Sequence, residues 1–324
     1  MPRLSIVIPC LGGAADFDGT LVAVLQHRPA GCEVLVVHRE PYGDPYRLSG
    51  EVRFLECGDA STLCGLLNAG IEAARAEIVH VLACGLEPVE GWTEPALDHF
   101  RDLEVAAVAP ALLDAGGSKL LAAGVRLSAG GGRCVLRDQR LLLPGSGHLR
   151  AAIRGPTLTA GFYRRRVLEA LGGFDAAATD RLADVALAVD LEALDLRTQL
   201  EPASRIARVI DPLVTAPDRA LARGWAAERL FWQNAASVGL PLPLALAAHT
   251  LTVAGSTLAD LPNPTGLLGR ALALCEIGSV QRKEGRLAAA AERLRAIADE
   301  SIVPIRRGLS APQVRQSVQR RRAA

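Results

Sequence analysis

The chain has 324 residues, of which 50% are apolar and 22% are charged. This composition argues against a disordered protein and is typical of a globular one with one large or two modest domains. Its formal net charge of +1 gives no general reason to expect nucleic acid as a partner.

Basic residues gather near the end of the chain. Residues 301–324 contain six Arg and no Asp or Glu. A tail of this kind is usually solvated and flexible, and the alternative is contact with an anionic membrane or another acidic surface. Together with the apolar region 240–261, the tail suggests one hypothesis in which residues 220–324 dock peripherally on a membrane surface.

Several features predict a cytoplasmic protein, peripheral at the inner membrane face if the docking hypothesis holds. The seven Cys are scattered and include no C-x-x-C pair, which favours reduced thiols over disulfides or a zinc site. The opening MPRLSIVIPC meets Pro9 too early for a secretory signal. The most apolar region, 238–261, contains two Pro, a His and an Asp, so we expect a peripheral helix or a core element there.

Strands and helices alternate over the first third of the chain. Short, β-branched apolar runs predict buried strands, and apolar residues at helical spacing predict helices. In chain order, we predict a strand at 4–9, a helix at 19–26, strands at 33–37 and 52–55, a helix at 61–75, a strand at 78–82, a helix at 92–101 and a strand at 105–110. This alternation predicts an α/β fold with a mostly parallel central sheet between helices.

The pattern changes after residue 110. Gly-Gly turns and short apolar runs predict hairpins or irregular loops at 120–143. Helices are predicted at 165–171, with a Gly172-Gly173 C-cap, at 182–194, around Trp225 and Trp232, and at 283–298. We therefore expect an α/β domain over residues 1–219, a helical C-terminal extension over 220–302 and a flexible basic tail over 303–324.

Five segments occur in an order that is typical of one protein family. They are LSIVIPC, EVLVVHRE, LLNAGIEAARAEIVHVL, APALLDAGGSKLLAAGVRL and GPTLTAGFYRRRVLEALGGFDAAATDRLADVAL. In this order they resemble glycosyltransferase family 2, whose members have the GT-A fold of nucleotide-diphospho-sugar transferases. The resemblance covers residues 1 to about 215. No single segment is highly specific, and the specificity comes from their combination.

The resemblance implies transfer of a sugar from a UDP-, GDP- or dTDP-sugar donor to a glycan or lipid-linked acceptor. By position, it implies nucleotide-sugar contacts at Pro9, His38, Asn68 and Gly85. It also implies a general base at Asp184, which matches the second carboxylate of the family's Glu-Asp pair in the segment LADVALAVD. The alternative for Asp184 is a helix-cap or surface carboxylate, because Ala183 replaces its partner.

The departures from the family pattern fall on the metal site. Family members hold Mg²⁺ or Mn²⁺ through an Asp-x-Asp motif, and the matching positions here are Ala83 and Gly85, on either side of Cys84. The late His of the family corresponds to Arg208. The sequence therefore predicts that the usual metal ligands are absent. Two hypotheses stay open: an active transferase without the usual metal or with a metal held by unexpected ligands, and an inactive relative that serves as a binding or scaffolding module in polysaccharide assembly.

Three further positions each allow two interpretations. Glu87 either replaces a lost metal ligand or is an exposed residue at a helix start. Arg164, Arg165 and Arg166 either bind phosphate directly in place of the metal or form the basic, solvated start of a helix. His80, inside an apolar strand, is predicted to be a satisfied interior imidazole in preference to a metal ligand.

Overall fold

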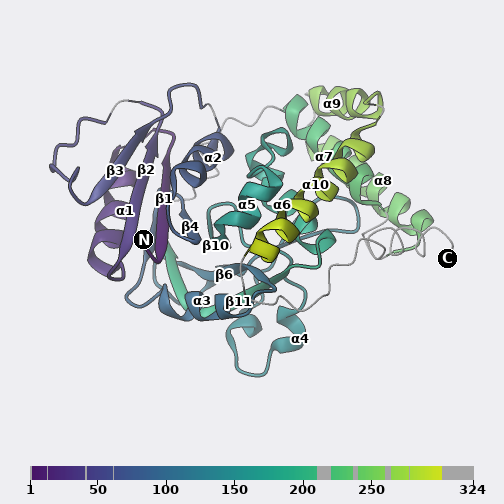
Figure 1. Cartoon of the computed structure of the whole chain (residues 1–324). Helices are drawn as coiled ribbons and strands as arrows, with labels where there is room; N and C mark the ends of the chain where they lie inside the picture. Colours follow the sequence, from purple (N-terminus) through teal and green to yellow (C-terminus); the bar gives the residue numbers. More distant parts are fainter. Residues whose placement is uncertain are drawn as a thin grey trace.

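The computed structural model describes residues 2–12, 14–40, 42–60, 62–209, 220–235, 240–259, 264–276 and 278–300. Within these ranges the chain forms a curled, mainly parallel sheet between helices, and a group of C-terminal helices lies beside it (Figure 1). The predicted basic tail, 303–324, lies outside the described residues.

Along the chain, strands alternate with helices as far as β11, and the described elements after it are helices. The strands are β1 (Leu4–Cys10), β2 (Cys32–His38), β3 (Val52–Glu56), β4 (Ile78–Leu82), β5 (Leu86–Pro88), β6 (Val105–Asp114), β7 (Leu120–Ala122), β8 (Val125–Leu127), β9 (Arg133–Val135), β10 (Ala160–Arg164) and β11 (Arg197–Arg208). The α-helices are α1 (Ala14–His27), α2 (Leu63–Ala73), α3 (Glu94–Asp98), α4 (Gly147–Arg150), α5 (Arg165–Leu171), α6 (Thr179–Ala193), α7 (Ala220–Asn234), α8 (Leu242–Ala259), α9 (Thr265–Leu274) and α10 (Ser279–Glu300).

Nine strands of the described chain form one sheet, in the order β3-β2-β1-β4-β10-β6-β11-β5, with β7 beside β6. The four strands from β3 to β4 are parallel neighbours, and β6 and β11 also run parallel. Strand β10 is antiparallel to both β4 and β6 and joins the two parallel parts. This arrangement confirms the predicted central sheet. Strands β8 and β9 pair as a separate hairpin, inside the region predicted to contain hairpins.

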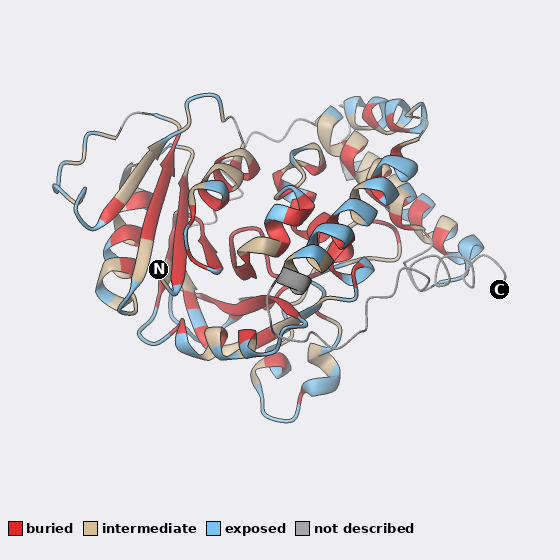
Figure 2. Ribbon diagram, viewed as in Figure 1, coloured by how far each residue is buried: buried red, intermediate tan, exposed pale blue. Residues whose placement is uncertain are grey.

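Apolar side chains cover the sheet on both faces. One core cluster joins α2, α5 and α6 to the sheet, and another joins α1 and α3 to it. Figure 2 shows the central strands buried and the outer faces of the surrounding helices exposed. Because β1 and β4 are buried on both faces, their sequences are almost entirely apolar, and each contains one buried polar residue, Ser5 or His80.

Helix α2 approaches β1 closely at Gly70. A Cβ atom at this position would lie 2.3 Å from Cγ1 of Val7 and 3.0 Å from Cγ2 of Val37, and both valines are buried.

We predict that Gly70→Ala lowers the free energy of unfolding by about 1–3 kcal/mol, because stiff valine side chains must shift to admit the methyl group. Urea denaturation measures the change. Gly255→Ala, at an exposed position of α8 where nothing lies within 4 Å, is the control and should not destabilise; equal losses in both variants would contradict the prediction.

Helix α10 is attached to the sheet domain through a buried ion cluster. The Asp190 carboxylate of α6, 3% exposed, lies 3.0 Å from Nζ of Lys283 and 2.5 Å from Nη2 of Arg286, both on α10. Lys283 also donates a hydrogen bond of 2.5 Å to Oδ1 of Asn234 on α7. Burial lowers the pKa of Lys283, and the charge of Asp190 opposes that shift. The C-terminal helices therefore pack against the sheet domain through specific charges as well as apolar contacts.

Most predicted elements are confirmed, and the differences are local. The predicted strand 78–82 and helix 165–171 match β4 and α5 in full, and Gly172 caps α5 in the left-handed conformation. Strands β5, β10 and β11 were not predicted. The apolar region 240–261 contains helix α8, as expected for a peripheral helix. Among the helices of the described residues, none combines the length and apolar character that crossing a membrane requires.

Candidate functional site

The parallel strands β1, β2 and β4 end at one edge of the sheet, and open α/β sheets bind ligands at such an edge. Cys10 pairs with His38 in the register of β1 and β2. The Pro9 carbonyl accepts a hydrogen bond of 3.1 Å from Sγ of Cys84, in the loop after β4. Three of the four predicted donor-contact positions, Pro9, His38 and Gly85, are thus brought together at this edge.

The loop after β4, where the resemblance places the metal motif, is held in position through the backbone of Gly85. This residue has a left-handed backbone conformation, with φ of 85°, which favours glycine. Its N–H donates to Oγ1 of Thr20 on α1 at 2.9 Å, and its carbonyl accepts from the N–H of Val209, just after β11, at 3.0 Å. The loop is therefore anchored from two sides through its backbone.

Asn68 lies in α2, and both ends of its amide contact the turn after α5. Its Nδ2 donates to the carbonyl of Phe174 at 2.9 Å, and its Oδ1 accepts from the N–H of Phe174 at 2.8 Å. Gly173 in this turn has a φ of 80°, and a Cβ there would lie 2.4 Å from Oδ1 of Asn68. Asn68 therefore holds the turn, and the predicted donor contact at Asn68 stays a prediction.

Tyr42, in the loop after β2, was not predicted as a site residue. Its ring stacks on that of Phe54 at 4.9 Å, and the ring of His38 lies 6.4 Å from Phe54. The Oη atom of Tyr42 is buried and has no hydrogen-bond partner among the described residues. Burial raises the pKa of Tyr42, and the nearby charge of Asp18 raises it further. The hydroxyl is therefore a neutral donor beside the sheet edge, and only its place after the second strand marks it in the sequence.

Asp184 is buried in the middle of α6 and paired with Arg133 of β9. The Nε atom of Arg133 lies 3.0 and 2.9 Å from the two carboxylate oxygens, and Nη2 lies 2.6 Å from Oδ2. The N–H of Leu158 donates to Oδ2 at 3.1 Å. The side chain of Asp184 is 0% exposed and that of Arg133 is 20% exposed. The helix-cap and surface interpretations of Asp184 are therefore wrong, and its catalytic role stays a prediction. No local signal marks Arg133 in the sequence.

Comparison with known proteins supports the fold. No family model matches the chain, and no curated protein is similar to it in sequence. A structure of GalNAc-T7 with UDP, GalNAc and Mn²⁺ aligns with 81% of this chain, at 11% identity and a TM-score of 0.55, and this chain spans 58% of that one. S. aureus TarS 1-349 aligns over 92% of this chain and 90% of its own, at 11% identity and a TM-score of 0.56. The chain has a GT-A glycosyltransferase-like fold.

The positions that the family resemblance assigns to the metal motif carry no side-chain oxygen. Ala83 presents a methyl group, Gly85 has no side chain, and the Cys84 thiol donates to a backbone carbonyl. Within the residues that the structure describes, no group of three or more His, Cys, Asp or Glu could hold a metal ion. Mg²⁺ and Mn²⁺ need several oxygen ligands. The residues present therefore do not fit the metal that the family resemblance implies.

Glu87 lies in a strand of the GT-A sheet and not at a helix start, so that interpretation is wrong. It stands in β5 opposite Ala207 of β11. Its Oε1 atom lies against α1, 3.0 Å from the point where a Cβ of Gly19 would be. Arg208 stands opposite Leu86 in the same pairing, and Leu86 directly follows Gly85 in the chain. A basic residue thus lies on the strand next to the Gly85 loop.

The three consecutive arginines lie at the opposite edge of the GT-A sheet. Arg164 ends β10 opposite Ile78, which begins β4, whereas the candidate donor edge lies where β4 ends. Arg164 is buried and donates to the carbonyls of Val105 at 2.8 Å and Phe100 at 2.5 Å. It also pairs with Glu77 at 3.0 Å. Arg164 therefore does not face the donor edge. The three arginines do form the basic start of helix α5, as one interpretation predicts, but Arg164 itself is buried and not solvated.

His80 is the satisfied interior imidazole that the sequence predicts. Its Nδ1 lies 3.1 Å from the Gly161 carbonyl, and its Nε2 lies 3.2 Å from Nε1 of Trp92. Burial lowers the pKa of His80 to about 3, so the ring is neutral. Since Trp92 can only donate, the proton of the neutral ring lies on Nδ1 and is donated to Gly161.

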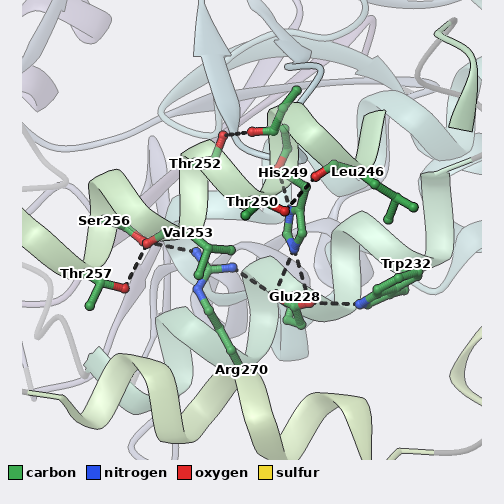
Figure 3. Close-up of polar contacts among 12 residues, drawn as sticks. Glu228, Trp232, Leu246, His249, Thr250, Thr252, Val253, Ser256, Thr257 and Arg270 are labelled. Atoms are coloured by element: carbon green, nitrogen blue, oxygen red, sulfur yellow. Dashed lines mark hydrogen bonds and ion pairs between the residues drawn. The ribbon is translucent and has the colours of Figure 1, made fainter. Parts of the chain in front are cut away.

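A polar network joins α7, α8 and α9 (Figure 3). Glu228 accepts hydrogen bonds from Nε1 of Trp232 at 2.8 Å, from Nη1 of Arg270 at 3.0 Å and from Nε2 of His249 at 3.1 Å. Nδ1 of His249 lies 2.8 Å from the carbonyl of Gly130. Burial opposes ionisation of Glu228, but these hydrogen bonds outweigh it and lower its pKa to about 2.

The depressed pKa of Glu228 predicts a pH dependence of stability. Because this pKa lies below the usual value of 4.5, the ionised network stabilises the fold above that value and stops doing so as the pH falls through about 2. At about pH 6, Glu228→Gln should therefore lower the free energy of unfolding by about 3 kcal/mol, and the difference from the wild type should shrink as the pH approaches 2. Urea denaturation at several pH values measures it. Glu51→Gln, in an exposed pair with Arg28, is the control and should have little effect.

Proposed function

We propose that this chain binds a nucleotide-sugar donor at the carboxyl edge of its sheet, without a divalent cation, and transfers the sugar to a glycan or lipid-linked acceptor. The observation that carries the proposal is the buried Tyr42 hydroxyl, which has no partner among the described residues and lies beside the edge formed by β1, β2 and β4. An oxygen or nitrogen of the nucleotide would satisfy it, and the stacked rings of Tyr42 and Phe54 offer an aromatic surface.

Arg208 is the residue that we assign to the diphosphate charge. In transfer, the acceptor oxygen bonds to the anomeric carbon of the sugar, the bond from that carbon to the diphosphate breaks, and negative charge develops on the leaving group. A guanidinium group suits phosphate oxygens and needs no metal. Arg208 stands opposite Leu86, next to the Gly85 loop, where the family has its late metal-binding His.

Asp184 is the proposed general base, which takes the proton of the acceptor hydroxyl. Its carboxylate is fully covered in the ion pair with Arg133, which is the more exposed member of the pair. An acceptor hydroxyl would reach Asp184 only when Arg133 turns away from it. Asp184→Asn should abolish transfer and leave donor binding unchanged, because the amide cannot act as a base.

Calorimetric titration with UDP-, GDP- and dTDP-sugars, with Mn²⁺ and with EDTA, tests donor binding. We expect saturable binding of one donor that EDTA does not weaken. Tyr42→Phe and Arg208→Gln should each weaken it about tenfold through the loss of one hydrogen bond or charge. Tyr46→Phe, in the same loop but exposed, and Arg205→Gln, on the same strand as Arg208 and exposed, are matched controls. Binding that requires Mn²⁺ would contradict the metal-free proposal.

The second candidate function is an inactive relative that serves as a binding or scaffolding module in polysaccharide assembly. The misfit between the donor set at Ala83–Gly85 and a divalent cation favours it, as does the covered carboxylate of Asp184. If no nucleotide sugar binds, the proposed transferase activity is contradicted and the inactive binding or scaffolding module is the candidate that remains.

Peripheral contact with the inner membrane face, on its cytoplasmic side, belongs to the same proposal. Exposed leucines gather on two C-terminal helices, with Leu251 and Leu258 on α8 and Leu268 and Leu274 on α9. Apolar helix surfaces of this kind bind membranes when basic residues add attraction to anionic lipids. Flotation with anionic liposomes tests the contact, and truncation after Ile302 should weaken it because it removes the basic tail.

A further inference from the structure

Two cysteines, Cys10 and Cys84, meet at the carboxyl edge of the sheet. Cys10 ends β1, and Cys84 belongs to the loop directly after β4. These strands are parallel neighbours, and their register pairs Val7 with Val81. When this register is continued along both strands, Cys10 comes to stand opposite Cys84. Sheet pairing therefore brings together two thiols that lie far apart in the sequence.

The thiol of Cys84 reaches across to β1. Its Sγ donates a hydrogen bond of 3.1 Å to the carbonyl of Pro9, the residue directly before Cys10. Both cysteine side chains pack against the core cluster on the α1 side of the sheet, so they lie on the same face. Neighbouring strands are about 5 Å apart, which is within the roughly 4.4–6.8 Å that separates the Cα atoms of disulfide-bonded cysteines. A rotation of the two side chains would therefore bring the sulfurs together.

The other cysteines differ from this pair in position, face or exposure. Cys57 follows β3 at the same edge but packs against the cluster on the opposite face. Cys32 begins β2 and lies at the far end of the sheet. Cys64 of α2 is buried, whereas Cys10 and Cys84 are both partly exposed. Cys10 and Cys84 are thus the two that share an edge, a face and access to solvent.

We propose that Cys10 and Cys84 are a redox-active pair that forms a reversible disulfide and thereby weakens donor binding at this edge. The effect on the donor rests on the proposed function, whereas formation of the disulfide does not. Reversible disulfides of this kind occur in reducing compartments, where most thiols stay reduced.

A peroxide is the oxidant that we assign to this reaction. One thiolate attacks a peroxide oxygen, the O–O bond breaks, and a sulfenic acid forms as the first water leaves. The second thiol attacks that sulfur, the S–S bond forms, and the second water leaves. In total the pair gives up two protons and two electrons, which reduce the peroxide to water. A dithiol reverses the reaction by thiol–disulfide exchange and is itself oxidised to a disulfide.

The disulfide would change contacts that hold the donor edge in position. To bond to Cys10, the Sγ of Cys84 must leave the carbonyl of Pro9. The next residue, Gly85, is anchored through its backbone to Thr20 and Val209, so a shift of Cys84 strains these anchors. Pro9 and Gly85 are both predicted donor contacts. The bond therefore acts directly on the loop that borders the donor.

Tyr42 is the third donor position that the pair affects. Burial raises its pKa most, the charge of Asp18 adds to that shift, and Cys10 makes a smaller contribution in the same direction. The thiol of Cys10 is therefore near the Tyr42 hydroxyl, which has no hydrogen-bond partner among the described residues. When the sulfur of Cys10 turns toward Cys84, the surroundings of this hydroxyl change as well.

Peptide mapping tests the disulfide without any ligand. The reduced full chain is treated with hydrogen peroxide, the remaining thiols are alkylated, and the digest is analysed by mass spectrometry. We expect a peptide in which Cys10 is linked to Cys84 and which dithiothreitol separates. Cys84→Ser should give no linked peptide at Cys10. Cys275→Ser, which removes an exposed thiol after α9, is the matched control and should form the same link. Absence of the link, or links of Cys10 mainly to other cysteines, would overturn the proposal.

Titration with UDP-, GDP- and dTDP-sugars tests the effect on the donor. Oxidation should weaken binding at least about tenfold, and dithiothreitol should restore it. Peroxide should not change the affinity of Cys84→Ser, whereas Cys275→Ser should respond as the wild type does. An unchanged affinity in fully linked protein would overturn control of the donor edge. If no donor binds even to the reduced protein, that control fails together with the proposed function, and the linked peptide alone decides whether the redox pair exists.

Discussion

Replacing Arg133 by Met should lower the free energy of unfolding by about 3–5 kcal/mol, because it leaves the fully buried carboxylate of Asp184 without its cation. Asp184→Asn should cost less, since the amide oxygen still accepts the N–H of Leu158 and the Arg133 cation that loses its partner is 20% exposed. Urea denaturation of both single variants and of the double variant gives the coupling between the two side chains.

The double variant decides whether the pair acts as a unit. If the carboxylate is costly only when it is unpaired, Arg133→Met together with Asp184→Asn should be less destabilised than the sum of the two single variants. Strict additivity would contradict the buried ion pair. Arg140→Met is the matched control, because Arg140 makes a similar pair with Asp138 on the surface and should change stability by no more than about 1 kcal/mol.

Asp190→Ala should also cost about 3–5 kcal/mol, because it removes the anion that Lys283 and Arg286 share between α6 and α10. Lys283 is 8% exposed, so without Asp190 its charge must be lost or α10 must move away from α6. Amide hydrogen exchange should then speed up along α10 while the central strands keep their protection.

A variant of the same helix controls for effects of charge alone. Arg282 forms an exposed pair with Glu276, so Arg282→Gln should leave both the stability and the exchange of α10 unchanged. Lys283→Met in the Asp190→Ala background should recover part of the loss, because it removes a buried unpaired ammonium group. Uniform acceleration of exchange across the whole chain in Asp190→Ala would contradict a role specific to α10.

Two of the strands that the sequence predicts, β1 and β4, are almost completely buried. Both faces of β1 and β4 are covered, so their residues are mostly apolar. A short run of apolar residues can be recognised in the sequence alone. Strand β11, RTQLEPASRIAR, was missed because its pattern is largely polar and half-exposed. It is a strand because β6 and β5 pair with it from distant parts of the sequence. Strand β10 is defined in the same way, by its place between β4 and β6.

In the candidate site, too, the sequence predicts residues that follow a local pattern and does not predict contacts between distant residues. The sequence places Pro9, His38 and Gly85 at the ends of predicted strands, and parallel pairing then brings them to one edge. The partners of Asn68 and Asp184 were not predictable, because Phe174 lies 106 residues from Asn68 and Arg133 lies 51 residues from Asp184. Such contacts depend on how α2, α6 and β9 pack in the folded chain, and no local sequence pattern predicts that packing.

By itself the sequence determined an α/β chain with a parallel sheet, a resemblance to glycosyltransferase family 2 and the absence of carboxylates at Ala83 and Gly85, because hydrophobic periodicity and residue chemistry are local properties. Only the tertiary structure decided that Asp184 is covered by Arg133, that Arg164 lies at the far edge of the sheet, and that the Cys84 thiol reaches the strand that Cys10 ends. Burial and charge pairing are set by residues distant in the chain, so they exist only once the helices and strands have packed together.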